Sequence, residues 1–215
     1  MIVALANPKG GVGKSTLATN LATMFAAKDR SVLLFDTDLQ RSVDKWGVMR
    51  ESLGIRPKVG HAAKTGDMYD TLAELSLATD VVIVDTAGKR GPELSLAISQ
   101  ADIVIVPVTP SQFDVWALDD IADVLENLTD KGAEFKSYAV INNTSYNPKS
   151  RDVKATRGAL KAYDAYFAAC ETHIVGKQVF KDALLTGQGV IEMDGGLRDE
   201  KATVQLWNFF KEIFE

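Results

Sequence analysis

Cysteine and histidine are scarce in this 215-residue chain, which has one cysteine, Cys170, and two histidines, His61 and His173. A single cysteine excludes an internal disulfide framework and any metal site built from several cysteines of one chain. The histidines have no neighbouring ligands at metal-site spacing, so we expect both to be structural or solvated. Cys170 ends the apolar run 167–170, which predicts a small core residue.

Long hydrophobic runs are also lacking. None approaches the roughly 20 residues that a membrane-spanning helix needs. The apolar stretch 2–6 is too short for the core of a signal peptide and has no basic flank. With 46% hydrophobic and 25% charged residues, the composition is that of an ordinary globular protein. We therefore expect a cytoplasmic protein whose residues 1–215 form a single domain.

Apolar runs and helical patterns alternate along the chain. Continuous apolar runs are typical of parallel strands that are buried on both faces. The alternation predicts an α/β fold with a mostly parallel central sheet and helices on both faces. The segment from Gly54 to Gly66 has the weakest pattern, and we expect it to be a surface connection. The expected strands are residues 2–6, 31–35, 81–84, 103–107 and 138–141.

Residues 7–16 read NPKGGVGKST and stand between the first apolar run and a helical pattern. A strand, a glycine-rich turn and a helix form the context that a phosphate-binding loop requires. The turn directs backbone N–H groups at a polyanion, and the helix adds the positive end of its dipole. We expect Lys14 to reach the β- and γ-phosphates and Ser15 to be a ligand of Mg²⁺. The predicted nucleotide contacts are Lys9, Gly10, Gly11, Val12, Gly13, Lys14, Ser15 and Thr16.

The loop departs from the strict pattern G-x-x-x-x-G-K-S/T, because Pro8 stands where that pattern has glycine. A second lysine, Lys9, precedes Gly10 and Gly11 instead. This form, K-G-G-x-G-K-S/T, resembles the deviant Walker A loop of the ParA/MinD family of ATPases. The resemblance implies a P-loop NTPase fold of that type and an ATP-bound homodimer, in which Lys9 is a catalytic residue that contacts phosphates on the other subunit. The alternative is a solvated lysine on a turn.

Carboxylates follow two further predicted strands, at Asp36, Asp38 and Asp85. The carboxyl ends of parallel strands are where ligands bind in open α/β sheets. By resemblance, Asp85 is the Walker B aspartate that holds Mg²⁺ through water, and Asp36 lies near the metal. Asp38, the third predicted catalytic residue with Lys9 and Lys14, helps to place the attacking water. The alternative is that Asp36 and Asp38 merely cap a helix that starts near Ser42.

Other positions extend the resemblance. Gly88 is placed to sense the γ-phosphate, and Asn142 stands where family members have an asparagine that contacts adenine. A turn asparagine would explain Asn142 equally well. Residues 107–111, PVTPS, are similar to the family's element at the start of the helix that borders the dimer interface. Leu39 replaces the proline of the family's D-x-D-P-Q element, which leaves the shape of that turn open.

Charge is unevenly distributed over a chain whose net charge is −5. Residues 102–130 contain seven acidic residues and no basic one, whereas residues 131–181 contain nine basic and four acidic residues. Such asymmetry suggests a side that faces a polyanion. Residues 151–167 have helical periodicity, with a basic stripe beside the apolar one. Small relatives of this type bind DNA nonspecifically, although a basic stripe can also be just a solvated helix face. The candidate DNA contacts are Arg151, Lys154, Arg157, Lys161, Lys177 and Lys181.

The segment 204–215 has the apolar periodicity of an amphipathic helix. MinD-type relatives place such a helix on anionic lipid through basic residues. Here Lys211 is outnumbered by Glu212 and Glu215, so we expect a helix that packs on the core and no membrane partner.

The resemblance as a whole implies an ATPase that depends on ATP and Mg²⁺ and is slow without a partner, since no strong general base is evident. We expect an ATP-bound homodimer on nonspecific DNA, and a ParB-type or cargo adaptor protein that stimulates hydrolysis. This cycle would drive plasmid or chromosome partition, or cargo positioning, on the nucleoid. Because the phosphate loop begins so early, we expect no N-terminal helix-turn-helix extension. The alternatives are a MinD-like membrane-associated positioning ATPase and a P-loop metabolic ligase or synthetase that acts on a small substrate.

Overall fold

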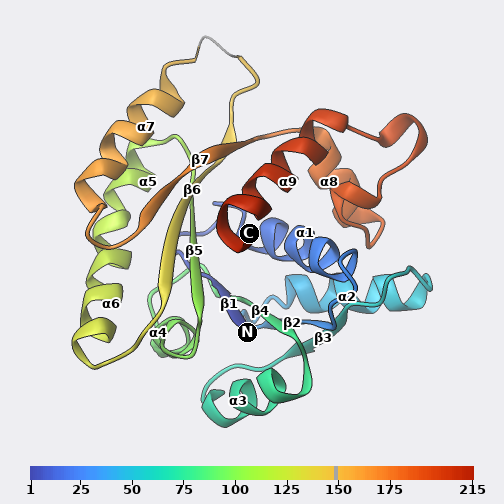
Figure 1. Ribbon diagram of the computed structural model, residues 1–215, viewed down its shortest axis with the longest axis horizontal. Helices are drawn as coiled ribbons and strands as arrows, with labels where there is room; N and C mark the ends of the chain where they lie inside the picture. The colour runs from blue at the N-terminus through green and yellow to red at the C-terminus, as the bar shows by residue number, and fades with distance from the viewer. Residues whose placement is uncertain (148–149) are drawn as a thin grey trace.

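The structure, a computed structural model, describes residues 1–147 and 150–215 and contains a seven-stranded sheet whose strand pairs are all parallel (Figure 1). The strand order is β3-β2-β4-β1-β5-β6-β7. The strands are β1 (Ile2–Leu5), β2 (Val32–Asp36), β3 (Gly60–Ala63), β4 (Val81–Asp85), β5 (Ile103–Val108), β6 (Lys136–Thr144) and β7 (Ala168–Val175). The helices are α1 (Lys14–Ala26), α2 (Ser42–Ser52), α3 (Tyr69–Ala78), α4 (Pro92–Ser99), α5 (Gln112–Trp116), α6 (Leu118–Asp130), α7 (Asp152–Leu160), α8 (Gln178–Leu185) and α9 (Glu200–Phe214), with short 3₁₀ turns η1 (Lys161–Tyr163), η2 (Val190–Glu192) and η3 (Gly195–Leu197).

The five predicted apolar runs form β1, β2, β4, β5 and β6, so the predicted α/β fold with a parallel sheet is confirmed. The interpretation of residues 54–66 as only a surface connection is wrong, because β3 lies within them. β3 is a four-residue edge strand whose residues are all at least partly exposed, so it lacks the continuous apolar run of a central strand. The other edge strand, β7, contains Cys170, which is buried as predicted.

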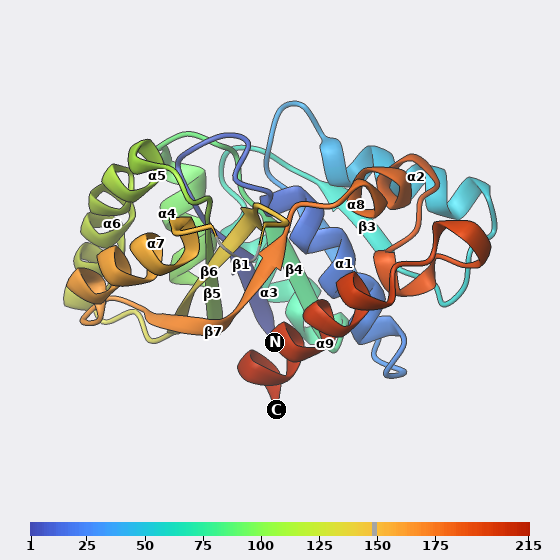
Figure 2. The ribbon, with the colours of Figure 1, turned by 90° about the horizontal axis from the view of Figure 1, so that it is seen from above.

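Side chains of successive strand residues point to opposite faces of the sheet and build two cores. In β1, Val3 and Leu5 join one buried cluster, whereas Ile2 and Ala4 join the other. The first cluster includes residues of α1, α2, α8 and α9, and the second includes residues of α3, α4, α6 and α7. Figures 1 and 2 show these two groups of helices on either side of the strands. The layers are therefore those predicted from the sequence.

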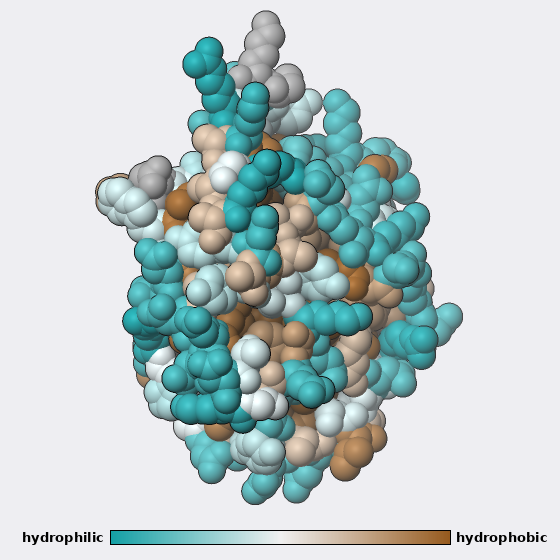
Figure 3. All heavy atoms as spheres, turned by 60° about the vertical axis from the view of Figure 1, so that its left-hand side comes forward, coloured by the Kyte–Doolittle hydropathy of each residue, from teal (hydrophilic) through white to brown (hydrophobic). Residues whose placement is uncertain are grey.

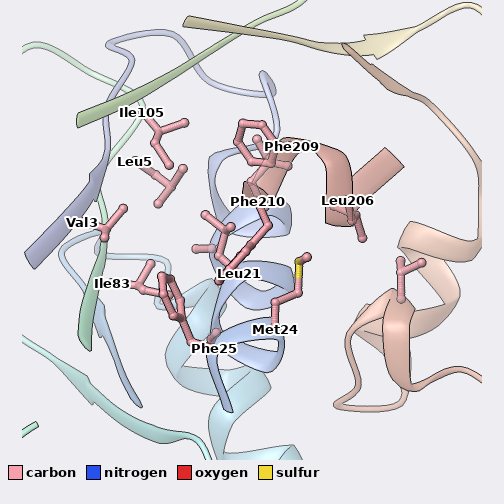
Figure 4. Close-up of a cluster of buried hydrophobic side chains, with 14 of the residues drawn as sticks. Val3, Leu5, Leu21, Met24, Phe25, Ile83, Ile105, Leu206, Phe209 and Phe210 are labelled. Carbon is pink, nitrogen blue, oxygen red and sulfur yellow. The ribbon is translucent and has the colours of Figure 1, made fainter. Parts of the chain in front are cut away.

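Helix α9 closes the first core. Its carboxylate cap is Asp199, which accepts a hydrogen bond from the Ala202 N–H at 3.0 Å. Leu206, Phe209 and Phe210 are buried, and the rings of Phe210 and Phe25 meet edge to face at 4.7 Å (Figure 4). Each such side chain contributes about 1.5–3 kcal/mol through burial. The predicted core-packing helix is confirmed, and its apolar face is already covered by the domain.

Among the helices that the structure describes, none combines the length and the apolar character needed to cross a membrane.

The basic region 151–167 is helical only to Leu160 and continues as the η1 turn. Thr156 and Leu160 are buried, as the periodicity predicted.

The sheet order brings the carboxyl ends of β1, β2 and β4 together, because β4 lies between β1 and β2. The phosphate loop and the aspartate-containing loops follow these three strands, so the topology gathers them at one edge.

Candidate functional site

The loop between β1 and α1 makes a tight turn that only glycine fits. Gly13 has φ +94°, and a Cβ on it would lie 2.2 Å from the Asn142 amide nitrogen. That Asn142 nitrogen donates a hydrogen bond of 2.8 Å to the carbonyl of Val12. Asn142 therefore tethers the loop from within strand β6, so the turn interpretation of this residue is wrong. Its predicted contact with adenine stays a prediction.

Lys14 is buried at the first turn of α1. Its ammonium donates to the carbonyls of Asn7 and Lys9, both at 2.9 Å. Burial lowers the pKa of Lys14 below its usual range, while the charge of Asp85 opposes this shift. The side chain is thus folded back along the loop, next to the carboxylates of the site.

Ser15 and Asp85 are joined directly. The Ser15 hydroxyl donates to Asp85 Oδ2 at 2.6 Å, and the carboxyl group is buried. Its other oxygen, Oδ1, has no hydrogen-bond partner among the described residues. Burial raises the pKa of Asp85 to about 7. A hydroxyl beside a carboxylate with an unpaired oxygen is a donor set that fits a hard cation such as Mg²⁺.

Asp36 and Asp38 have separate environments. Asp36 is fully buried, and its Oδ2 accepts the backbone N–H groups of Val43 at 2.9 Å and Asp44 at 3.2 Å. It therefore caps α2, which begins at Ser42, and its predicted place near the metal stays a prediction. Burial raises its pKa, against the effect of these hydrogen bonds. Asp38 accepts the N–H of Gln40 at 3.0 Å and lines the cavity beside the loop.

Two cavities flank the phosphate loop. One, of about 410 Å³, is lined by Lys14, Ser15, Asp38 and Gly88 among others. Gly88 lies so close to the loop that a Cβ on it would be 2.8 Å from Gly10 Cα. The second cavity, of about 400 Å³, lies on the Asn142 side. The two cavities share Gly11, Gly13 and Thr16 as lining residues, so together they form a site that is divided by the loop.

Lys9 points away from these cavities. Its ammonium forms an ion pair with Asp114 of α5 and lies 6.0 Å from the ring centroid of Phe113. The Lys9 side chain is 37% exposed, whereas that of Asp114 is 3% exposed. Asp114 also accepts a hydrogen bond from the Thr109 hydroxyl. Lys9 is therefore a partly exposed lysine with an ion-pair partner in its own chain, and its predicted role across a dimer interface stays a prediction.

Two residues of this region were missed at the sequence level. Asn7 is fully buried, accepts the Lys9 N–H at 2.8 Å and donates to the Pro107 carbonyl at 2.9 Å. The feature of the sequence that could have indicated a role for Asn7 is its position directly after a buried strand. Asp114 is one of the seven acidic residues of 102–130, and nothing in its local pattern indicates a partner in the phosphate loop.

The six candidate DNA contacts do not share one surface. Arg151, Lys154 and Lys161 are exposed on and next to α7. The left-hand side of the molecule in Figure 1, which carries α7, comes forward in Figure 3, where hydrophilic residues cover much of the surface. Lys177 and Lys181 belong to the α8 region on the opposite side of the sheet, where Lys181 lines the Asn142 cavity.

Two of these cations are also neutralised within the chain. Arg157 donates to the Glu171 carboxylate at 3.0 Å and to the carbonyl of Cys170 at 3.1 Å. Lys177 contacts both carboxylate oxygens of Asp199, at 2.7 and 3.0 Å. The structure therefore leaves Arg151, Lys154, Lys161 and Lys181 as the more accessible members of the set.

Comparisons with known proteins agree with this geometry. The family model described as "CobQ/CobB/MinD/ParA nucleotide binding domain" matches residues 3–185. The maintenance of carboxysome distribution protein A of Halothiobacillus neapolitanus is 26% identical, over 98% of this chain and 95% of the relative. The protein of the same name from Gloeobacter kilaueensis is 30% identical, over 90% of this chain and 85% of the relative.

Solved structures show the same fold. Apo McdA from Cyanothece superposes with a TM-score of 0.78 at 18% identity, over 98% of both chains. The MinD cell division protein of Aquifex aeolicus gives 0.69 at 20% identity, over 98% of this chain and 95% of that one. The match of the family model over most of the chain, together with the loop geometry, leads to one conclusion: this chain belongs to the CobQ/CobB/MinD/ParA family of nucleotide-binding domains.

Proposed function

We propose that residues 1–215 form a single ATPase domain that dimerises with ATP, binds DNA nonspecifically and positions a cargo on the nucleoid. The observation that carries this proposal is the pair of loop lysines. Lys14 is buried near the Asp85 carboxylate, whereas the side chain of Lys9 in the same loop points away from the cavities and is 37% exposed. Lys14 can thus serve its own site, and Lys9 can serve a neighbouring molecule once it leaves Asp114. The relatives named for carboxysome distribution support the positioning role.

Each residue of the site has a role in this proposal. The loop N–H groups from Gly10 to Thr16 bind the phosphates, and Lys14 neutralises their charge in cis. Ser15 and Asp85 hold Mg²⁺, with Asp36 nearby. The metal, when bound, withdraws charge from the phosphate oxygens. Gly88 contacts the terminal phosphate end of the site, Asp38 orients water, and Asn142 lies on the adenine side.

Hydrolysis by these residues alone is slow. Phosphoryl transfer depends mainly on positioning and charge stabilisation. Of the three predicted carboxylates, Asp36 caps α2 and Asp85 is bonded to Ser15. Only Asp38 lines the cavity without such a bond. Lys9 of a second subunit adds positive charge only after dimerisation. An adaptor protein of the ParB or cargo type would complete the site and accelerate turnover. This arrangement makes the DNA-bound dimer dependent on ATP.

The experiment that tests this function measures retention on nonspecific DNA with ATP, with ADP and without nucleotide, over a salt series. We expect retention only with ATP, and a loss of affinity as salt rises. Equal retention in all three states contradicts the ATP-dependent cycle. Binding to anionic vesicles without DNA binding favours the membrane-associated alternative. Turnover that needs a small phosphate acceptor favours the ligase alternative.

A further inference from the structure

A short segment near the end of the chain, residues 187–192, contacts both helices that leave the loops of the nucleotide site. Helix α1 follows the phosphate loop, and α2 follows the loop that contains Asp36 and Asp38. The contacts are made by buried polar side chains that the roles proposed above do not use. Figure 2 shows α8, which precedes this segment, beside α1, and the two helices are in contact.

Arg50 makes the contact from α2. Its side chain is almost completely buried, with 1% of the residue exposed. The guanidinium donates to the two carboxylate oxygens of Glu192 at 2.6 and 2.7 Å, and to the carbonyl of Gly187 at 2.9 Å. One turn earlier, the Trp46 indole N–H donates to the carbonyl of Gln188 at 3.3 Å. A two-pronged, charge-assisted contact of this kind fixes orientation as well as distance.

Asn20 makes the contact from α1. Its amide oxygen accepts the backbone N–H of Val190 at 2.8 Å, and its amide nitrogen donates to the carbonyl of Thr16 at 2.7 Å. Asn20 is 1% exposed. Since Thr16 lines both cavities of the site, this asparagine joins the segment directly to the first turn after the phosphate loop.

The segment lies directly against the helices because two of its residues are glycines. Gly187 has φ +66°, and a Cβ on it would be 3.0 Å from the backbone of Arg50. A Cβ on Gly189 would be 2.0 Å from the hydroxyl oxygen of Thr23 on α1. Larger side chains at either position would force the helices away from the segment.

Helix α2 is thus held at both ends. Asp36 accepts the N–H groups at its start, and Arg50 is bound near its last turn. A helix held in this way cannot shift toward or away from α1 without breaking one of the two contacts. Because α2 follows the Asp38 loop, its place relative to α1 sets how Asp38 faces the phosphate loop.

We propose that the Arg50–Glu192 ion pair is a positioning pair for the nucleotide site. It fixes α2 against α1 through residues 187–192, and it makes the order of this segment depend on whether nucleotide is bound. The segment follows α8, so the same contact joins the nucleotide site to the helix that contains Lys181. This inference rests on the proposed function for the identity of the nucleotide.

Hydrogen–deuterium exchange with MgADP as the probe tests the linkage without turnover. In the unmodified chain, MgADP should slow amide exchange both in residues 10–16 and in residues 187–192. In Arg50→Lys and Glu192→Gln, protection of residues 10–16 should remain, while residues 187–192 should exchange about tenfold faster and no longer respond to MgADP. Protection of residues 10–16 alone in the unmodified chain, or an unchanged response in both variants, overturns the proposal.

The matched control is Glu200→Gln, which removes a carboxylate paired with Arg198 at 2.8 Å on the surface. It should exchange like the unmodified chain, and the Glu192→Gln pattern in this control would overturn a specific role for Arg50. Kinetics supply the second readout: Glu192→Gln should lower kcat about tenfold and leave MgADP affinity within about threefold. An equal loss of kcat and of MgADP affinity in Glu192→Gln would indicate a merely structural role and overturn the proposal.

The two proposals fail separately. Nucleotide protection of both segments in a chain that never hydrolyses ATP would contradict the proposed ATPase and leave the positioning pair standing. Conversely, turnover with no response of residues 187–192 to MgADP would contradict the positioning pair alone.

Discussion

Lys9 of the phosphate loop forms an ion pair with Asp114 of α5 within one chain. The carboxylate of Asp114 is buried and is also bound by the Thr109 hydroxyl. In the proposed ATP-bound dimer, Lys9 has to leave this partner before it can contact phosphates on the second subunit. We therefore expect the ion pair to oppose dimerisation, and its strength to set how readily Lys9 becomes available.

Substitution of these two residues should shift the dimer equilibrium in opposite directions. Lys9→Ala removes the cation proposed to act in trans and should abolish ATP-dependent dimerisation. Asp114→Asn keeps an acceptor for Thr109 but weakens the hold on Lys9, and should tighten the ATP-bound dimer about tenfold. Sedimentation equilibrium with ATP and with ADP measures both effects. Dimerisation of Lys9→Ala at the unmodified level would reject the trans role.

The pKa of Asp85 predicts how metal-dependent binding varies with pH. Because burial raises this pKa to about 7, most chains hold a proton on Asp85 at pH 6 and few do at pH 8. In the proposed site Mg²⁺ is held by the ionised Asp85 carboxylate, so affinity for MgADP should rise about tenfold from pH 6 to pH 8. Titration calorimetry with and without Mg²⁺ measures this rise. Asp85→Asn should remove it, and a metal effect independent of pH would contradict the prediction.

The same raised pKa predicts a stability effect. The pKa of Asp85 in the folded chain lies above the ordinary pKa of an aspartate. Between about pH 4 and pH 7 the folded chain therefore binds more protons than the unfolded chain. The contribution of Asp85 to the free energy of unfolding therefore falls as pH rises through this window. Urea unfolding of the nucleotide-free chain and of Asp85→Asn at several pH values isolates this contribution.

Cys170 should be chemically inert in the folded protein. It is buried, and burial raises the pKa of its thiol to about 12. At pH 8 the thiolate fraction should be about a thousandfold below that of an exposed cysteine, so alkylation should be slower by at least two orders of magnitude. Mass spectrometry after treatment with iodoacetamide, with and without urea, measures this. Rapid alkylation of the native protein would place Cys170 at the surface.

Substitutions on α7 test the predicted DNA surface. Lys154→Glu should weaken ATP-dependent DNA binding at every sequence and reduce the slope of log affinity against log salt by about one. Arg157→Gln should have a smaller effect, because Arg157 is bound to Glu171. Lys131→Glu changes the charge equally at the end of α6 and is the matched control. Equal losses for Lys154→Glu and Lys131→Glu would indicate a general charge effect.

Helix α9 should be essential for stability. Phe209→Ala empties a fully buried position and should lower the free energy of unfolding by about 3–5 kcal/mol. Val204→Ala, on the same helix but 54% exposed, should cost less than about 1 kcal/mol. Chemical denaturation compares the two. Similar values would mean that α9 does not close the core.

The sequence determined the elements whose signal is local. Residues 7–16 contain a motif whose turn and following helix are adjacent in the chain, and the central strands are continuous apolar runs, so both could be predicted. The carboxylates after β2 and β4 could also be predicted, because parallel strands place their ends at one edge. The edge strand β3 could not, since a strand paired on one side needs no continuous apolar run.

Only the tertiary structure decided which charged side chains meet. Lys9 with Asp114, Arg50 with Glu192 and Lys177 with Asp199 are each separated by long stretches of chain. The tertiary structure also placed the basic residues of α7 and α8 on opposite sides of the sheet, although the sequence groups them in one basic region. The physical reason is that a charge has no preferred partner in the sequence. Its partner is set by how apolar faces pack, and that packing brings distant residues into contact.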